Sequence, residues 1–112
     1  MSDGYNGWKN YETWAVNLWL SNEQSSDSYW NATAQELYDE AEADETFTRD
    51  ERASLDLADR LKDEHEQAQP ELGCSLWADL LGAAMSEVNW YEIASHYIAD
   101  VDKDEPESTV KP

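Results

Sequence analysis

The residues best suited to do chemistry in this chain are acidic, and four of them recur at helical spacing. Asp56, Asp59, Asp63 and Glu66 follow one another every three or four positions. This spacing places their side chains on one face of a helix, with neighbours roughly 5 Å apart along its axis. Like charges so close repel each other by about 0.2–0.5 kcal/mol per pair. A basic partner would relieve this repulsion, so the pattern favours a surface that binds positive charge.

The predicted partner-binding set extends to a second helix. Between Asp27 and Glu71 the chain carries 15 acidic and four basic residues. We predict that the outward acids of two helices form the contact surface: Glu36, Asp39, Glu40, Asp56, Asp59, Asp63 and Glu66. An even spread of the acids would leave about 240 Å² of surface per carboxylate, whereas B-DNA carries one charge per roughly 105 Å². The acids can therefore imitate DNA only if they gather on one face.

Other candidate chemistry is sparse. Glu92 and His96 are four residues apart and could ligate a metal or exchange a proton, but we interpret them as a structural pair. The second histidine, His65, falls on a different predicted helix, and Cys74 is interpreted as a small buried apolar residue. The sequence contains neither a glycine-rich phosphate loop nor a nucleophile elbow. We therefore predict no enzyme activity, no catalytic or metal-binding residue and no cofactor.

Net charge excludes whole classes of partner. Seven basic and 26 acidic residues give a formal charge of −19. Direct binding to nucleic acid or to an anionic membrane needs positive charge, so both are excluded and a basic protein is the expected partner. The first residues form no secretion signal, no apolar run is long enough to span a membrane, and one cysteine cannot form an internal disulfide. We expect a cytoplasmic protein.

Hydrophobic spacing predicts five helices that would hold these residues. Three of them begin at patterns typical of N-caps: Asn10, Thr48 with a glutamate three residues later, and Asn89 with another such glutamate. The polar run from Ser21 to Ser28 is interpreted as a loop. The predicted helices span residues 11–20, 28–43, 48–69, 74–85 and 90–101.

The predicted fold is all-α, with one compact domain over residues 1–101 and a disordered charged tail over residues 102–112. We expect the core to form around the tryptophan-rich first helix and the apolar fourth helix, with the second and third helices as an acidic outer layer. The fourth helix would direct these residues inward: Leu76, Trp77, Leu80, Leu81 and Ala84.

The N-terminal region is unusually aromatic. It contains Tyr5, Trp8, Tyr11, Trp14 and Trp19. We interpret these side chains mainly as core, with Trp8 packing back on the first helix, and a contact with a second copy or with a partner stays open. Stacking on nucleic-acid bases is excluded because basic residues are lacking nearby.

Two motifs carry a resemblance to a known family. The stretch from Asn6 to Leu20 contains an Asn-Gly-Trp turn, then Asn-Tyr-Glu-Thr-Trp and an aliphatic helix, and Val88 to Ala94 reads Val-Asn-Trp-Tyr-Glu-Ile-Ala. Together, about a fifth of the chain resembles a family of small proteins found largely in phages and other mobile elements. The family has no general assigned activity, so the resemblance implies a genomic setting. Small, very acidic proteins in that setting are often anti-defence factors.

Charge and resemblance together lead to one functional hypothesis and one alternative. The hypothesis is an anti-CRISPR or anti-restriction inhibitor that binds a basic, nucleic-acid-binding surface of a host protein by partial DNA mimicry. The alternative is a non-enzymatic interaction protein of a phage or a halophile. In the alternative, acidity serves solvation and the aromatic first helix mediates dimerisation.

Overall fold

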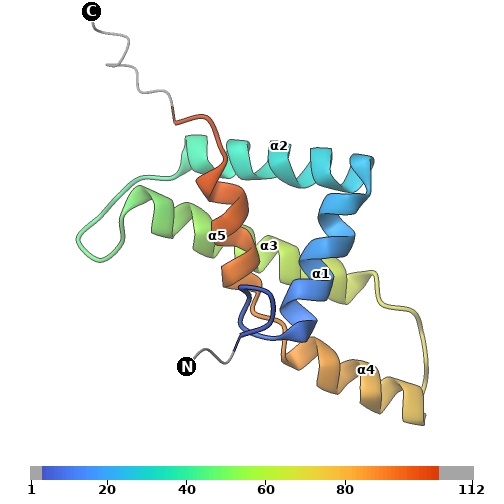
Figure 1. Cartoon of the computed structure of the whole chain (residues 1–112). Coiled ribbons are helices and arrows are strands. Elements are labelled where there is room, and N and C mark those ends of the chain that lie inside the picture. Colours follow the sequence, from blue (N-terminus) through green and yellow to red (C-terminus); the bar gives the residue numbers. More distant parts are fainter. Residues whose placement is uncertain (1–3, 104–112) are drawn as a thin grey trace, which may run out of the picture.

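A computed structural model describes residues 4–103, and within them the chain is all-α, as predicted. Five helices follow one another along the chain (Figure 1). They are α1 (Tyr11–Asn22), α2 (Gln24–Glu40), α3 (Arg49–Gln67), α4 (Leu76–Ser86) and α5 (Trp90–Ala99). The one β-type contact in the described part joins Tyr5 to Trp8. No helix among the described residues is long and apolar enough to cross a membrane.

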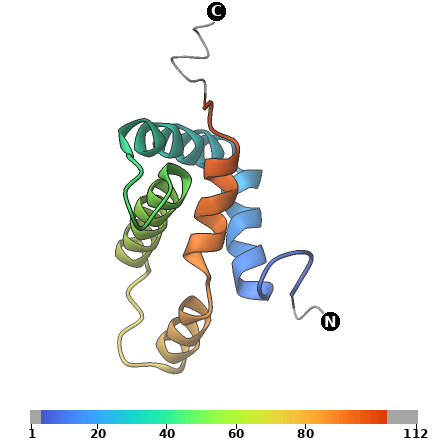
Figure 2. The same ribbon diagram turned by 90° about the vertical axis from the view of Figure 1, so that its left-hand side faces the viewer.

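Four of the helices form two layers. α2 and α3 lie side by side in one layer, and α1 and α5 cover them from the other side (Figures 1 and 2). α4 lies at one edge of this body. Its C-terminal end is next to the start of α5, and its N-terminal end points away from the other helices (Figure 1).

The core lies where α3, α5 and α2 meet. α3 packs more extensively against α5 than any other two helices pack against each other. Leu57 and Leu61 of α3 and Ile93 and Ile98 of α5 are almost fully buried. Trp30 of α2 is buried in the same cluster. Each of these helices places an apolar stripe inward, because its apolar residues recur every three or four positions.

The predicted arrangement of the core is therefore wrong in two respects. None of the residues of α4 is buried, and Leu76, Trp77 and Leu80 are exposed rather than inward. α2 and α3 are central helices rather than an outer layer, since they supply much of the core from one face and carry acids on the other. The apolar composition of α4 indicated that it needs burial, but composition does not specify which surface provides it.

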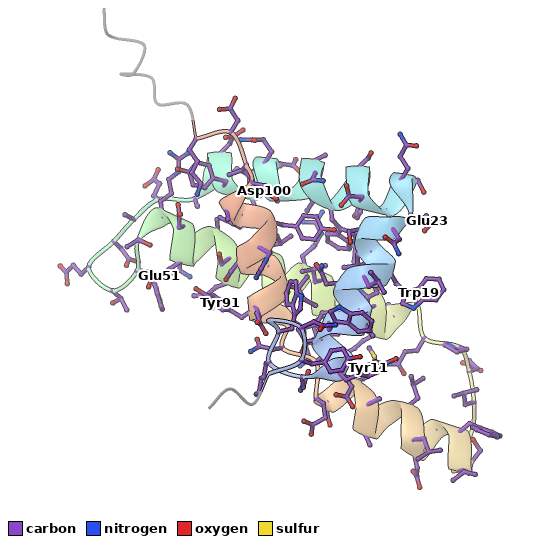
Figure 3. The ribbon with its side chains drawn as sticks, in the orientation of Figure 1. Tyr11, Trp19, Glu23, Glu51, Tyr91 and Asp100 are labelled. Carbon is purple, nitrogen blue, oxygen red and sulfur yellow. The ribbon has the colours of Figure 1, made fainter. Side chains whose placement is uncertain are left out.

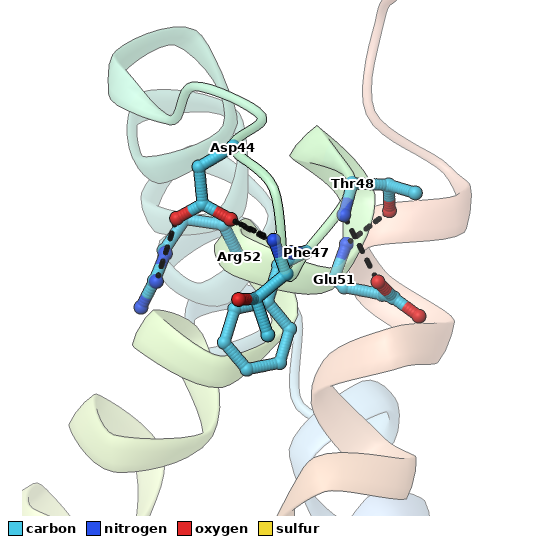
Figure 4. A network of polar contacts seen from close by, with 6 residues as sticks. Asp44, Phe47, Thr48, Glu51 and Arg52 are labelled. Atoms are coloured by element: carbon cyan, nitrogen blue, oxygen red, sulfur yellow. Dashed lines mark hydrogen bonds and ion pairs between the residues drawn. The ribbon is translucent and has the colours of Figure 1, made fainter.

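The predicted N-caps are confirmed. Thr48 and Glu51 form a capping box: the Thr48 hydroxyl accepts from the Glu51 amide at 3.0 Å, and the Glu51 carboxylate accepts from the Thr48 amide at 2.9 Å (Figure 4). Just before it, Asp44 accepts from the Phe47 amide at 2.8 Å and approaches Arg52 at 3.5 Å. These bonds close the loop that joins α2 to α3.

One predicted loop is helical instead. The polar run after Leu20 was expected to be a loop as far as Ser28, but α1 continues to Asn22 and α2 begins at Gln24. Only Glu23 has extended backbone angles. The polar residues here are the solvent-facing positions of two helices joined by a sharp bend, and their polarity alone does not distinguish the two cases.

The chain remains ordered slightly beyond the predicted domain boundary. The backbone amide of Asp102 donates to the side-chain oxygen of Gln35 at 2.8 Å. The side-chain nitrogen of Gln35 donates in turn to the backbone carbonyl of Asp102 at 3.0 Å. Lys103 pairs with Asp50 at 3.0 Å. Residues 104–112, the remainder of the predicted tail, lie outside the described residues.

Candidate functional site

The seven predicted binding residues lie on α2 and α3, on the sides that face away from the core. We call this set the acidic face: Glu36, Asp39, Glu40, Asp56, Asp59, Asp63 and Glu66. All are exposed except Asp56, which is half-buried. On each helix these residues fall opposite the buried stripe, so rigid helices direct the carboxylates to solvent.

Most of the acidic face has no polar partner within the described residues. Asp39 accepts a hydrogen bond from Gln35 at 3.0 Å, and Glu66 lies 3.9 Å from Lys62 in an exposed pair. The other five carboxylates form no hydrogen bond or ion pair in the part of the chain that the structure describes. Their charge is therefore uncompensated by neighbouring side chains.

Several basic side chains of α3 are engaged elsewhere. Arg49 donates to the Tyr38 carbonyl at 3.0 Å and lies over the Tyr38 ring at 4.1 Å. Arg60 donates to Glu64 at 3.0 Å, and this bond raises the pKa of the Arg60 guanidinium. Arg52 lies over the Phe47 ring. These contacts hold positive charge beside other groups rather than over the central acids of α3.

The two motifs that carry the family resemblance meet in space. Asn10, the N-cap of α1, donates to the Glu87 carbonyl at 2.7 Å and accepts from the Thr13 hydroxyl at 2.6 Å. The same hydroxyl accepts from the amide of Asn89, the N-cap of α5, at 2.8 Å. We call Asn10, Thr13, Glu87 and Asn89 the cap-to-cap network. It ties the starts of α1 and α5 together, which gives both motifs a structural role.

Glu92 and His96 also serve this junction. The Glu92 carboxylate accepts from the Lys9 amide at 3.0 Å. The His96 ring stacks on Trp8 with centroids 4.1 Å apart, so the ring contact of Trp8 is with α5, whereas the sequence predicted packing on α1. Asn6 and Gly7, both with positive φ, form the tight turn that brings Trp8 there. The described residues contain no cluster of three or more potential metal ligands.

The remaining candidates are distributed singly. His65 is half-buried between Trp30 and Trp90, with ring centroids 5.8 and 5.4 Å away, and its Nδ1 lies 2.7 Å from the Leu61 carbonyl. Cys74 is exposed, which contradicts the expected buried position. It lies in the α3–α4 loop just ahead of the Ser75 N-cap, where the apolar periodicity does not reach.

A small polar cleft separates α1, α2 and α5. It has a volume of ≈ 210 Å³, and its lining includes Asp27, His96, Tyr97 and Asp100. The buried Tyr97 hydroxyl donates to the Asp27 carboxylate at 3.1 Å. Burial first, and the negative charge of Asp27 second, raise the pKa of the Tyr97 phenol well above its usual value. The bond joins α5 to the first turn of α2.

This raised pKa predicts an alkaline loss of stability. Below about pH 10 both folded and unfolded chains keep the Tyr97 proton, whereas above it only the folded chain does. The free energy of unfolding of the wild type should therefore fall above pH 10, by up to about 1.4 kcal/mol per pH unit, relative to Tyr97→Phe. Urea titrations of both proteins between pH 8 and 11.5 measure this difference. Parallel pH curves would contradict the assignment.

Aromatic side chains of the N-terminal region divide between contact and solvent. Tyr5, Tyr11 and Trp14 form a cluster of rings with centroids 4.9 to 5.5 Å apart, in which Trp14 is half-buried. Trp19 is 76% exposed and projects outward from α1 (Figure 3). Of the apolar residues of α1, only Leu20 is fully buried. None of the five aromatic residues singled out in the N-terminal region is buried, and three of them are exposed, so the interpretation of these side chains mainly as core is wrong. The helix covers the body with one side and exposes the other.

Fold and surface together define an acidic, all-α protein whose two central helices carry outward-facing carboxylates, five of which have no polar partner among the described residues. The chain belongs to the family described as "Family of unknown function (DUF7249)", whose model matches residues 1–107. No match was found among curated proteins or among solved structures.

Proposed function

We propose that this protein is a non-enzymatic inhibitor of the anti-defence type, which acts in the cytoplasm of a host cell. It binds a basic, nucleic-acid-binding surface of a host protein through the acidic face. The observation that carries this proposal is that Asp56, Asp59 and Asp63 stand on a rigid helix with no side-chain partner among the described residues. Carboxylates positioned before binding lose little conformational entropy in a complex.

The acids of α3 are fixed on a helix before any partner binds. A segment that is disordered in the free protein would instead lose about 1–2 kcal/mol per residue in backbone entropy when it orders on binding. The acids of α3 require no such ordering. Their spacing of about one turn also concentrates charge locally, as partial DNA mimicry requires.

The proposal predicts a large kinetic effect of neutralising three acids. Asp56→Asn, Asp59→Asn and Asp63→Asn together should leave the fold intact and slow association with the basic partner more than tenfold at low salt. The partner is captured from a nuclease-treated host lysate on immobilised wild type, and association rates are then measured with the isolated partner. Duplex DNA should compete for the same site.

A matched control separates the acidic face from overall charge. Glu42→Gln, Glu45→Gln and Glu71→Gln remove three exposed charges from loops on other parts of the chain. This control should associate at nearly the wild-type rate. Equal slowing of association in both triple variants would mean that net charge, and not the acidic face, determines the rate. A helix variant that associates like wild type, with no competition by DNA, would favour solvation as the reason for the acidity.

A further inference from the structure

The second feature of the surface is the unpartnered helix α4. Its inner side makes the contact with the body: Met85 packs against the core, and Leu81 is half-buried. Its outer side begins with Leu76 at 63%, Trp77 at 65% and Leu80 at 53% exposure. These three positions lie within about 100° of one another around a helix. α4 therefore has a second apolar face that the described chain leaves in water.

Such a helix is poorly suited to an isolated position. It has only 11 residues, and helices shorter than about 12–15 residues are marginal in water without packing. The Ser75 hydroxyl caps its start by accepting from the Ala78 amide at 3.1 Å, which favours the helix locally. On the α3 side, an open cleft of ≈ 430 Å³ lined by Lys62, Glu66 and Met85 leaves the packing incomplete. Contact of the outer face with another protein surface would therefore stabilise α4.

The outer face is complementary to itself. If two α4 helices run antiparallel with Leu80 of each at the centre, the bulky Leu76 and Trp77 of one helix face Ala83 and Ala84 of the other. Large side chains then meet small ones, which is how packed helices interdigitate. A two-fold symmetric interface requires this kind of self-complementarity, because the same patch supplies both sides.

The charge distribution also favours α4 over α2 and α3 as the place where two copies of the chain meet. In a chain of net charge −19, the segment from Leu72 to Ser86 carries only Asp79. Asp79 lies about 100° from Leu80 around the helix, at the rim of the outer face. Two copies that meet through α4 thus bring together a part of the chain that carries little charge. Contact through α2 or α3 would bring many carboxylates together.

We propose that α4 mediates homodimerisation, with the α4 helices of two chains packed antiparallel about a two-fold axis at Leu80. The exposed parts of Leu76, Trp77 and Leu80 offer roughly 300–400 Å² per chain. A standard stable interface buries about 800 Å² per partner. The dimer is therefore concentration-dependent, and it tightens with salt because screening reduces repulsion between the two acidic bodies. This inference is independent of the proposed function.

Sedimentation velocity over a wide concentration range, in 0.1 M and 1 M salt, tests the dimer. Wild type should dimerise with increasing concentration and do so more tightly in 1 M salt. Leu80→Glu should weaken association at least tenfold, and its helix content by circular dichroism should match the wild type because Leu80 is exposed in the single chain. Trp19→Glu is the matched control on α1 and should dimerise like wild type.

The outcomes decide between distinct cases. A wild type that stays monomeric at every concentration overturns the proposal. A partner other than a second copy would then have to contact the outer face of α4. Loss of the dimer in Trp19→Glu with retention in Leu80→Glu also overturns it, since the interface would then be α1. Loss in both variants rejects α4 as the interface on its own.

Disulfide trapping tests the register. In a Cys74→Ser background, Leu80→Cys places the new thiol opposite itself across the axis, within reach of a disulfide. Leu76→Cys separates the two thiols by about 12 Å along the helices, because eight residues at 1.5 Å lie between them. Oxidation should link only the Leu80→Cys chains. Linking at Leu76 instead of Leu80 rejects the antiparallel pairing.

Discussion

Leu57→Ala should lower the free energy of unfolding by about 3 kcal/mol, whereas Leu80→Ala should lower it by less than about 1 kcal/mol. Leu57 is fully buried where α3 meets α5, so truncation leaves a cavity in the core. Leu80 is 53% exposed, so truncation removes little buried surface from a single chain. Urea denaturation of both variants, at protein concentrations too low for association, gives the comparison.

This pair of substitutions distinguishes the observed core from the one expected on apolar composition. Both residues are leucines in the middle of helices, and Leu80 is one of the residues of α4 that the sequence predicts to face inward. A cost of about 3 kcal/mol at Leu80 and little at Leu57 would place the core around α4 and contradict the structure. Equal costs at both positions would mean that α4 packs on the body much more closely than its exposure indicates.

Local signals predicted the helices well because their causes are local. Asn10, Thr48 and Asn89 each cap a helix by accepting from an amide three residues later, and both partners of these bonds lie within one turn. The apolar spacing that predicted α3 is also local, and the fully buried Leu57 and Leu61 lie on this apolar stripe. Periodicity also predicted that the acids of α2 and α3 face outward, because the face opposite a buried stripe must meet solvent.

Long-range pairing could not be predicted in the same way. Nothing in the sequence near Trp8 indicates that it stacks on His96, and nothing near Lys9 indicates Glu92 as its acceptor. α4 shows the same limit in a different form. Its apolar residues occupy most of its circumference, so periodicity specifies no single inner face, and the helix contacts the body through the side that carries Met85.

The candidate site depends on local features that the sequence predicts and on contacts that it does not predict. The position of each acid on its helix follows from the sequence, but the absence of partners for Asp56, Asp59 and Asp63 within the described residues does not. It depends on Arg49 lying over the Tyr38 ring of α2, which is a contact between two helices, and on Arg60 pairing with Glu64 four residues later in α3. Charge count alone predicted an acidic surface, whereas the distribution of the basic residues leaves its centre uncompensated.

The cap-to-cap network predicts that a buried hydroxyl stabilises the contact between the starts of α1 and α5. Thr13→Val keeps the shape of the side chain but removes the hydroxyl, which donates to Asn10 at 2.6 Å and accepts from Asn89 at 2.8 Å. Thr13 is fully buried, and the Asn89 amide, which is part-buried, would lose its acceptor. The free energy of unfolding should fall by about 1–3 kcal/mol.

Thr13→Ser is the matched control, because it keeps the hydroxyl and loses only a methyl group. It should cost less than Thr13→Val, about 1 kcal/mol for the lost apolar contact. Urea denaturation of the two variants separates the hydrogen bonds from packing. If valine were tolerated better than serine, packing around the side chain would outweigh the network, and the shared Asn-Tyr-Glu-Thr-Trp and Val-Asn-Trp motifs would need another explanation than the joining of two helix starts.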